Sequence, residues 1–241
     1  MKFTILTLFP EIIEGYFKSS IMAKAVEKGI ITYNVVDIRS FCLDKYTSCD
    51  DYPYGGGAGM VMKTEPLARA LDSVNASSIR TIYPSPSGKL FSQKYASALA
   101  EEEELVFICG RYEGIDQRII DSYVDDEICI GDYVISSGEI ASLVIVDAVY
   151  RLFDGVISKE SLEEESFSNG LLEYPQYTRP EVWHDMRVPE ILLSGHHANI
   201  KKWRHEQALI TTAKKRPELL EKVELSDEDL AIIHKVVDFN K

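Results

Sequence analysis

The sequence predicts an α/β domain with a parallel sheet, followed by a smaller helical domain. Short apolar segments alternate with segments of helical periodicity up to about Phe153, a spacing typical of parallel βαβ units. After Phe153 this alternation stops, and from Pro189 onward the pattern is helical without strands. The chain has 241 residues, of which 45% are hydrophobic, enough to bury one substantial core and a small second domain.

Five apolar segments predict the strands: residues 3–9, 31–38, 80–85, 105–110 and 127–136. Helical periodicity follows Pro10, Glu65, Ser92, Gly114 and Gly138. The last of these helices, residues 139–149, is apolar on nearly all sides, whereas a helix on a solvated surface keeps a polar face. We therefore expect it to lie in a core, either as a central helix alone or also at a subunit interface.

The segment between Asp154 and Pro180 is acidic, contains glycine and ends in proline, as linkers and functional loops do. It predicts a domain boundary. We expect a first domain over residues 1–160, a linker over residues 161–180 and a helical domain over residues 181–241.

Composition excludes several classes of protein. No apolar stretch is long enough to span a bilayer or to act as a signal peptide, and the four cysteines show no CxxC pair. These features predict a cytoplasmic protein without a membrane partner. The net charge of −13 argues against a protein that coats DNA or RNA non-specifically, so any nucleic-acid site must be local. The five histidines show no spacing typical of zinc sites.

One local basic segment exists, at residues 201–216, where six Lys or Arg face one Glu with Trp203 and His205 between them. Cations near aromatic rings suit an RNA backbone and stacked bases. An ordinary solvated helix face fits the same pattern. Both interpretations stay open from this segment alone.

The segment DDYPYGGGAGM, residues 50–60, carries four glycines within five positions. It is not a Walker loop, because Met62 precedes Lys63-Thr64, and it does not satisfy GxGxxG. A single structural turn needs one or two glycines. We therefore expect a functional loop whose backbone approaches a ligand closely or repeatedly adopts positive φ.

Three further segments follow predicted strands: SPSGK at 85–89, CGRYEGIDQR at 109–118 and IGDYVISSGE at 130–139. The carboxyl ends of parallel strands meet at one edge of a sheet, where open α/β folds bind ligands. The three segments together predict one pocket at that edge.

These segments, with GLLEYPQYTRP and VPEILLSGHHANIKKWR, resemble the bacterial tRNA (guanine-N1)-methyltransferase family TrmD of the SPOUT class, in order over essentially the whole chain. The resemblance implies a SPOUT-type parallel-sheet domain with a deep trefoil knot, a helical tRNA-binding domain and a homodimer. It also implies transfer of a methyl group from S-adenosylmethionine to N1 of the guanosine just 3′ of the tRNA anticodon. The family is associated with Mg²⁺; its ligands here are unknown.

The resemblance also implies roles for individual residues. Those expected around S-adenosylmethionine are Ser85, Pro86, Gly110, Tyr112, Glu113, Ile130, Gly131, Asp132, Tyr133, Val134, Ile135 and Gly138. Those expected to hold the guanosine are Asp51, Tyr54, Gly55, Gly56 and Gly57. Lys201, Lys202 and Arg204 are expected to hold tRNA because they belong to the local basic segment, independently of the resemblance. The glycine loop would then make room for a base pulled from its stack.

The expected catalytic residues are Glu165 and Arg151. N1 of neutral guanine bears a proton, so a carboxylate must remove it as the methyl group arrives. The family commonly has an aspartate where this chain has Glu165, and a different loop length after Arg151 would move the role to Glu164. Arg151 would stabilise the negative charge that spreads to O6. The chain also has Ser137 and His196 where the family usually has glycine and asparagine.

Two alternative functions remain. A non-enzymatic RNA-binding protein would bind tRNA without transferring methyl. A related SPOUT enzyme would methylate a ribose 2′-OH in another RNA, and mapping the modified nucleotide distinguishes the two reactions.

Overall fold

The computed structural model of the protein describes residues 1–238 and forms two compact units. The first unit spans Met1–Ser158, and the second begins at Lys159. The last residues of the predicted helical domain, 239–241, lie outside the described part. No described helix is both long and apolar enough to cross a bilayer.

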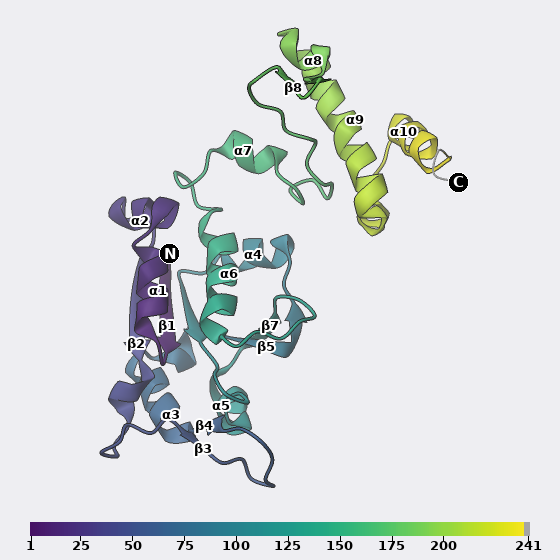
Figure 1. Ribbon diagram of the computed structural model, residues 1–241. Helices are drawn as coiled ribbons and strands as arrows, with labels where there is room; N and C mark the ends of the chain where they lie inside the picture. The colour runs from purple at the N-terminus through teal and green to yellow at the C-terminus, as the bar shows by residue number, and fades with distance from the viewer. Residues whose placement is uncertain (239–241) are drawn as a thin grey trace. The chain divides into compact units, whose positions relative to one another are not determined.

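The first unit contains a sheet of five strands, shown in Figure 1. Its strands are β1 (Lys2–Thr7), β2 (Thr32–Asp37), β5 (Thr81–Leu90), β6 (Glu104–Ile108) and β7 (Asp126–Cys129), in the order β2-β1-β6-β5-β7. Every neighbouring pair is parallel. The predicted α/β class with a parallel sheet is confirmed.

Two strands, β5 and β7, end more than two residues away from their predicted bounds. β5 continues to Leu90, with a register shift against β7 between Pro84 and Lys89. The strand predicted over residues 127–136 ends at Cys129. Gly131 has a φ of +154°, and the Tyr133 N–H donates back to the Gly131 carbonyl at 2.8 Å. The backbone therefore turns where the apolar sequence alone suggested a longer strand.

Helices cover both faces of this sheet. One buried cluster joins the sheet to α1 (Pro10–Phe17), α2 (Ser20–Glu27), α4 (Gln93–Leu99) and α6 (Gly138–Tyr150). A second cluster joins it to the 3₁₀ helix Ile38–Phe41, α3 (Thr64–Ser73) and α5 (Gln117–Tyr123), with a 3₁₀ turn at Ala76–Ser78. Phe3 and Ile5 of β1 enter the first cluster, whereas Leu6 enters the second. The strand alternation thus places apolar side chains on both faces.

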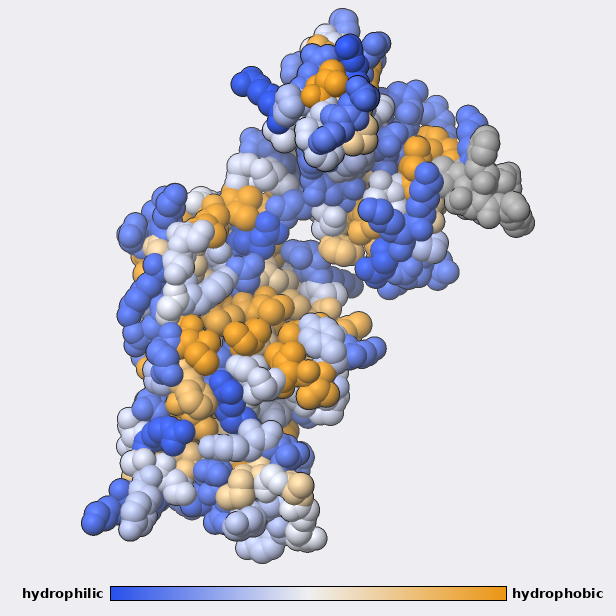
Figure 2. Space-filling model, in the orientation of Figure 1, coloured by the Kyte–Doolittle hydropathy of each residue, from blue (hydrophilic) through white to orange (hydrophobic). Residues whose placement is uncertain are grey.

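Helix α6 lies partly in the core and partly at the surface. Ile145 and Val149 are fully buried, whereas Ile140 and Val144 are 47% and 43% exposed. Figure 2 shows hydrophobic residues gathered on this side of the first unit. Because Ile140 and Val144 are one helical turn apart, they form an apolar stripe, and α6 is not a central helix enclosed by the core of one chain.

The glycine-rich segment lies between two short strands, β3 (Asp50–Asp51) and β4 (Val61–Met62), which pair antiparallel. Strands of two residues leave no period in the sequence, so this hairpin was not predicted.

The second unit is mainly helical. It contains α7 (Lys159–Glu164), a hairpin of β8 (Val182–Trp183) and β9 (Met186–Arg187), α8 (Glu190–Leu193), α9 (His197–Lys215), a 3₁₀ helix at Pro217–Lys222 and α10 (Asp227–Asp238). Its core is small and centres on Leu171, Ala208 and Leu209. Helix α7 lies in the segment expected to be irregular; its Lys, Glu and Leu residues are good helix formers.

Candidate active site

A pocket of about 280 Å³ lies at the carboxyl ends of β6 and β7 and beside residues 83–86, where the pairing of β5 with β7 shifts its register. It is lined by Tyr83, Pro84, Ser85, Pro86, Gly110, Arg111, Tyr112, Glu113, Gly114, Ile128, Cys129, Ile130, Gly131, Tyr133, Val134, Ile135, Ser136, Ser137, Gly138 and Ala141. All three motifs that follow predicted strands contribute to it. The sheet topology explains this convergence, because parallel strands present their carboxyl ends at one edge.

The residues predicted around the cofactor line this pocket, with the exception of Asp132. Sequence reasoning missed Tyr83 and Arg111. Tyr83 lies inside a predicted strand, where an apolar segment indicates core and not a ligand site. Arg111 belongs to the motif CGRYEGIDQR, between Gly110 and Tyr112, but no role was predicted for its guanidinium.

Close packing explains two glycines at the pocket. A Cβ on Gly110 would lie 2.8 Å from the ring of Tyr83, which is itself 8% exposed. A Cβ on Gly138 would lie 2.4 Å from the Gly110 backbone nitrogen, and the Gly138 N–H donates to the Gly110 carbonyl at 3.1 Å. Burial raises the pKa of Tyr83, so its hydroxyl stays neutral. The wall of the pocket thus depends on backbone contact between two loops distant in sequence.

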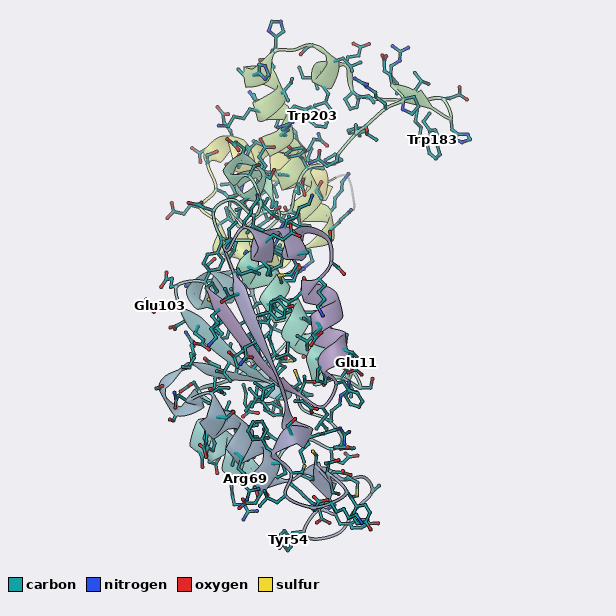
Figure 3. The ribbon with its side chains drawn as sticks, turned by 90° about the vertical axis from the view of Figure 1, so that its left-hand side faces the viewer. Glu11, Tyr54, Arg69, Glu103, Trp183 and Trp203 are labelled. Atoms are coloured by element: carbon teal, nitrogen blue, oxygen red, sulfur yellow. The ribbon has the colours of Figure 1, made fainter. Side chains whose placement is uncertain are left out.

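A second, more open pocket of about 640 Å³ lies beside the glycine loop. It is lined by Asp51, Tyr52, Pro53, Tyr54, Val61, Met62, Lys63, Thr64, Glu65, Ile115, Asp116, Gln117 and Arg118. Of the residues predicted to hold the guanosine, Asp51 and Tyr54 line it, whereas Gly55, Gly56 and Gly57 do not. The side chain of Tyr54 is fully exposed at the end of the loop (Figure 3).

The glycine loop is joined to the first pocket by its backbone. The Glu113 N–H donates to the Met60 carbonyl at 2.9 Å, and the Met62 N–H donates to the Gly114 carbonyl at 3.0 Å. Glycines 55, 56, 57 and 59 have φ values of +89°, +76°, +126° and +85°. This confirms the expectation of repeated positive φ, a region that other residues avoid. The loop is therefore built around backbone conformation and lies next to Glu113.

Comparison with known proteins identifies the family. The model of the family described as tRNA (guanine-1)-methyltransferase TrmD matches residues 1–222. A tRNA (guanine-N(1)-)-methyltransferase of Treponema denticola is 68% identical over 222 residues, which cover 92% of this chain and 91% of that protein. Those of Treponema pallidum and Borreliella burgdorferi are 62% and 60% identical, covering 91% and 95% of this chain and 88% and 97% of the relatives. The chain belongs to the TrmD family of tRNA (guanine-1)-methyltransferases. The resemblance found in the sequence, and the enzyme class it implied, are confirmed.

For a member of the TrmD family, the two expected catalytic residues come from different units. Arg151 follows the last residue of α6 in the first unit and is partly buried. Glu165 follows α7 in the second unit, where its carbonyl accepts hydrogen bonds from the Ser168 N–H at 3.3 Å and the Ser168 hydroxyl at 2.7 Å. Arg151 thus lies in the first unit and Glu165 in the second, and their joint role in catalysis stays a prediction.

The neighbouring carboxylate, Glu164, has other partners. Both of its oxygens lie 2.9 Å from Nη1 of Arg204 on α9, and the Tyr174 hydroxyl donates to it. The Arg204 guanidinium also lies 4.8 Å from the centre of the Tyr174 ring. Burial, followed by the hydrogen bond to Glu164, raises the pKa of Tyr174. Glu164 therefore attaches α7 to α9 within the second unit.

The three basic residues expected to bind tRNA differ in their surroundings. Lys201 and Lys202 are exposed on the first turns of α9. Arg204 is engaged with Glu164, so it is a less direct candidate than sequence spacing suggested. Trp203, labelled in Figure 3, packs against Tyr177 with ring centres 6.4 Å apart.

Among the side chains that the structure describes, no group of three or more His, Cys, Asp or Glu is arranged to hold a metal ion. The four cysteines are free thiols.

Proposed function

We propose that this chain transfers the methyl group of S-adenosylmethionine to N1 of the guanosine 3′-adjacent to the tRNA anticodon, as a cytoplasmic enzyme. The observation that carries the proposal is the pocket at the carboxyl edge of the sheet, lined by three loops in a chain of the TrmD family. Family membership supplies the reaction class, and the pocket supplies a site for the methyl donor.

The lining residues suit S-adenosylmethionine. Ile130, Tyr133 and Ile135 offer apolar walls for an adenine ring, while Gly110 and Gly131 expose backbone polar groups. Glu113 offers a carboxylate that suits a cationic or hydroxyl-bearing ligand. When bound, S-adenosylmethionine supplies an electrophilic methyl group on a sulfonium that is its own leaving group.

The protein has then two chemical tasks, alignment and proton removal. We infer that the loop of residues 50–60 holds the flipped guanine, because Asp51 and Tyr54 line the second pocket and the same loop is hydrogen-bonded at Met60 to Glu113, which lines the first. Glu165 takes the N1 proton, and Arg151 stabilises the charge that develops on O6. Glu164 is a weaker candidate base, because its carboxylate already pairs with Arg204.

We further propose that the loops of the pocket form a trefoil knot and that two chains make each site. Support for the knot is the close packing of backbone segments that are distant in sequence. A Cβ on Gly138 would lie 2.4 Å from the backbone nitrogen of Gly110, and a Cβ on Gly88 would lie 2.4 Å from the carbonyl carbon of Glu127. Such threading is rare among folds. Support for the dimer is the exposed stripe of Ile140 and Val144 on α6, an apolar surface next to the pocket that a second chain would bury.

The test is incubation with labelled S-adenosylmethionine and unmodified tRNA, followed by mapping of the methylated atom. The proposal requires label at guanine N1 of the nucleotide 3′ of the anticodon. Label on a ribose 2′-OH would identify a different SPOUT reaction. Binding of tRNA with no transfer would identify an RNA-binding protein that retains the pocket.

A further inference from the structure

A buried ion pair connects two walls of the candidate active site. Glu139, the second residue of α6, is 0% exposed, and its Oε2 lies 2.8 Å from Nη2 of Arg111. Arg111 belongs to the loop that follows β6, and its Nη1 donates to the Ser136 carbonyl at 3.1 Å. One guanidinium therefore contacts both the first turn of α6, through Glu139, and the 130–137 loop, through Ser136.

The carboxylate of Glu139 is fixed from two further sides. The Thr7 hydroxyl, at the end of β1, donates to Oε1 at 2.5 Å, and the Ser137 hydroxyl donates to Oε2 at 2.9 Å. Ser137 is also the N-cap of α6, where a carboxylate in the first turn is favoured by the helix dipole. Glu139 thus joins the sheet, the Arg111 loop and the start of α6.

Burying the Arg111–Glu139 ion pair removes two charges from water, so a gain in stability does not by itself explain why the pair is present. Replacing a buried ion pair by well-packed apolar residues is often neutral or stabilising. Arg111 Nε is buried and has no hydrogen-bond partner among the described residues, and its guanidinium lies 4.4 Å from the centre of the Phe9 ring. Buried polar groups without a partner are uncommon in native structures, so the placement of the Arg111 side chain calls for an explanation.

The 130–137 loop needs such an anchor because its side chains give little packing. Val134 is 88% exposed and Tyr133 is 58% exposed, yet both line the pocket. Glu139 itself does not line the pocket. Any effect of Glu139 on a ligand must therefore act through Arg111 and the loop.

We propose that Arg111 and Glu139 are positioning residues that hold the 109–114 and 130–137 loops at the spacing that S-adenosylmethionine requires. The ligand part of this inference rests on the proposed function. The positioning part concerns the loops alone and can be measured without ligand.

The first experiment is hydrogen exchange of the unliganded full chain, comparing wild type with Glu139→Gln and Arg111→Lys. Glutamine keeps the size of the side chain but removes its charge, and lysine keeps the charge but cannot reach two partners with a rigid fork. The amides of residues 130–137 should exchange faster in both variants than in the wild type. Unchanged exchange in this loop overturns the inference, whatever ligand the pocket takes.

The second experiment measures binding of S-adenosylmethionine by calorimetry, together with kcat and KM for methyl transfer. The Kd and the KM for S-adenosylmethionine should rise about tenfold, the effect of losing one hydrogen bond to a charged group. The KM for tRNA should not change. If loop exchange increases but binding of S-adenosylmethionine does not weaken, the pair has only a structural role. If the wild type itself does not bind S-adenosylmethionine, the proposed function fails and the exchange result stands alone.

A matched control is Arg80→Lys. Arg80 also bridges two carboxylates, Asp126 at 2.7 Å and Glu102 at 3.0 Å, but at the amino ends of the strands, away from the pocket. It should lower the midpoint of thermal unfolding without changing the Kd for S-adenosylmethionine. If Glu139→Gln does not fold, Arg111→Lys carries the same test, because the Arg111 side chain is 18% exposed whereas that of Glu139 is fully buried.

Discussion

Glu164 and Glu165 are adjacent carboxylates with different surroundings, and this difference makes the general base testable. Glu165→Gln keeps the size and a hydrogen-bonding oxygen but cannot take a proton. We expect methyl transfer in single-turnover assays to fall by roughly a hundredfold or more, while tRNA and S-adenosylmethionine still bind. Glu165→Asp restores the residue common in the family and should stay active.

Glu164→Gln is the matched control for this prediction. It weakens the contact of α7 with Arg204 and Tyr174, so it should change the stability of the second unit more than the rate of transfer. The opposite pattern, with a fast Glu165→Gln enzyme and a slow Glu164→Gln enzyme, would move the role of base to Glu164. If both variants are fast, neither carboxylate removes the proton.

At the scale of elements, the glycine loop can be tested with two substitutions of similar backbone cost. Gly55 and Gly59 have φ values of +89° and +85°, so alanine is strained by roughly 1–2 kcal/mol at each position. A Cβ at Gly55 meets nothing within 4 Å, whereas one at Gly59 would lie 2.3 Å from Oε1 of Glu113. Gly59→Ala must therefore displace Glu113 in the pocket.

We expect Gly59→Ala to reduce methyl transfer by roughly tenfold to a hundredfold relative to Gly55→Ala, because small displacements in a site are costly. Steady-state kinetics of the two variants make the comparison. Equal rates would mean that the contact with Glu113 does not matter to the reaction.

The first turns of α9 carry the second prediction at this scale. Replacing exposed Lys201 and Lys202 with alanine should weaken tRNA binding and reduce the slope of log K against log salt by about 1–2, since two phosphate contacts are lost. Affinity for S-adenosylmethionine should not change. Replacing Lys24 of α2 and Lys28, which follows α2, with alanine removes the same charge from two other exposed positions and should leave the slope as it is. A salt slope that is unaltered in the α9 variant excludes this helix from the RNA site.

The strand beginnings give a prediction about pH. Burial alone would raise the pKa of Asp126, but hydrogen bonds from Arg80 and Tyr95 outweigh it and lower the pKa. Because the pKa is lower in the folded state, the contribution of Asp126 is complete above its ordinary value near 3.8 and disappears as the pH falls through the lowered value. The urea midpoints of wild type and Asp126→Asn should differ by a constant amount from pH 8 to 5, and the difference should shrink as the pH falls below the ordinary value of 3.8 and vanish below the lowered pKa. A difference that does not shrink as the pH falls below 3.8 contradicts this assignment.

At the scale of the whole molecule, the proposed dimer predicts that two inactive chains can restore one another. A Glu165→Ala chain and a Tyr133→Ala chain each lack one part of the site. If each site combines the second unit of one chain with the pocket of its partner, hybrids contain one intact site and regain part of the activity. Subunit exchange must be demonstrated separately, with differently tagged chains. Exchange without recovered activity would show that each site is formed within one chain.

Much of the fold and part of the site follow from local patterns in the sequence. Apolar segments alternating with helical periodicity predicted the parallel sheet, because strands buried on both faces are apolar throughout. Three motifs after strands predicted one pocket, because parallel strands end at one edge. The cluster of glycines predicted positive φ, because only glycine adopts it without strain.

The sequence by itself therefore determined the α/β class, the edge of the sheet that carries the pocket, the unusual backbone of residues 50–60 and the TrmD family. The tertiary structure alone decided the strand order, the end of β7 at Cys129, the pairing of Glu164 with Arg204 and that of Arg111 with Glu139. The physical reason is the separation along the chain over which each kind of interaction acts. Periodicity and turn chemistry act between neighbours in the chain, whereas Arg111 meets Glu139 only because Gly138 lets the start of α6 approach the Gly110 backbone, a contact between segments that no local pattern encodes.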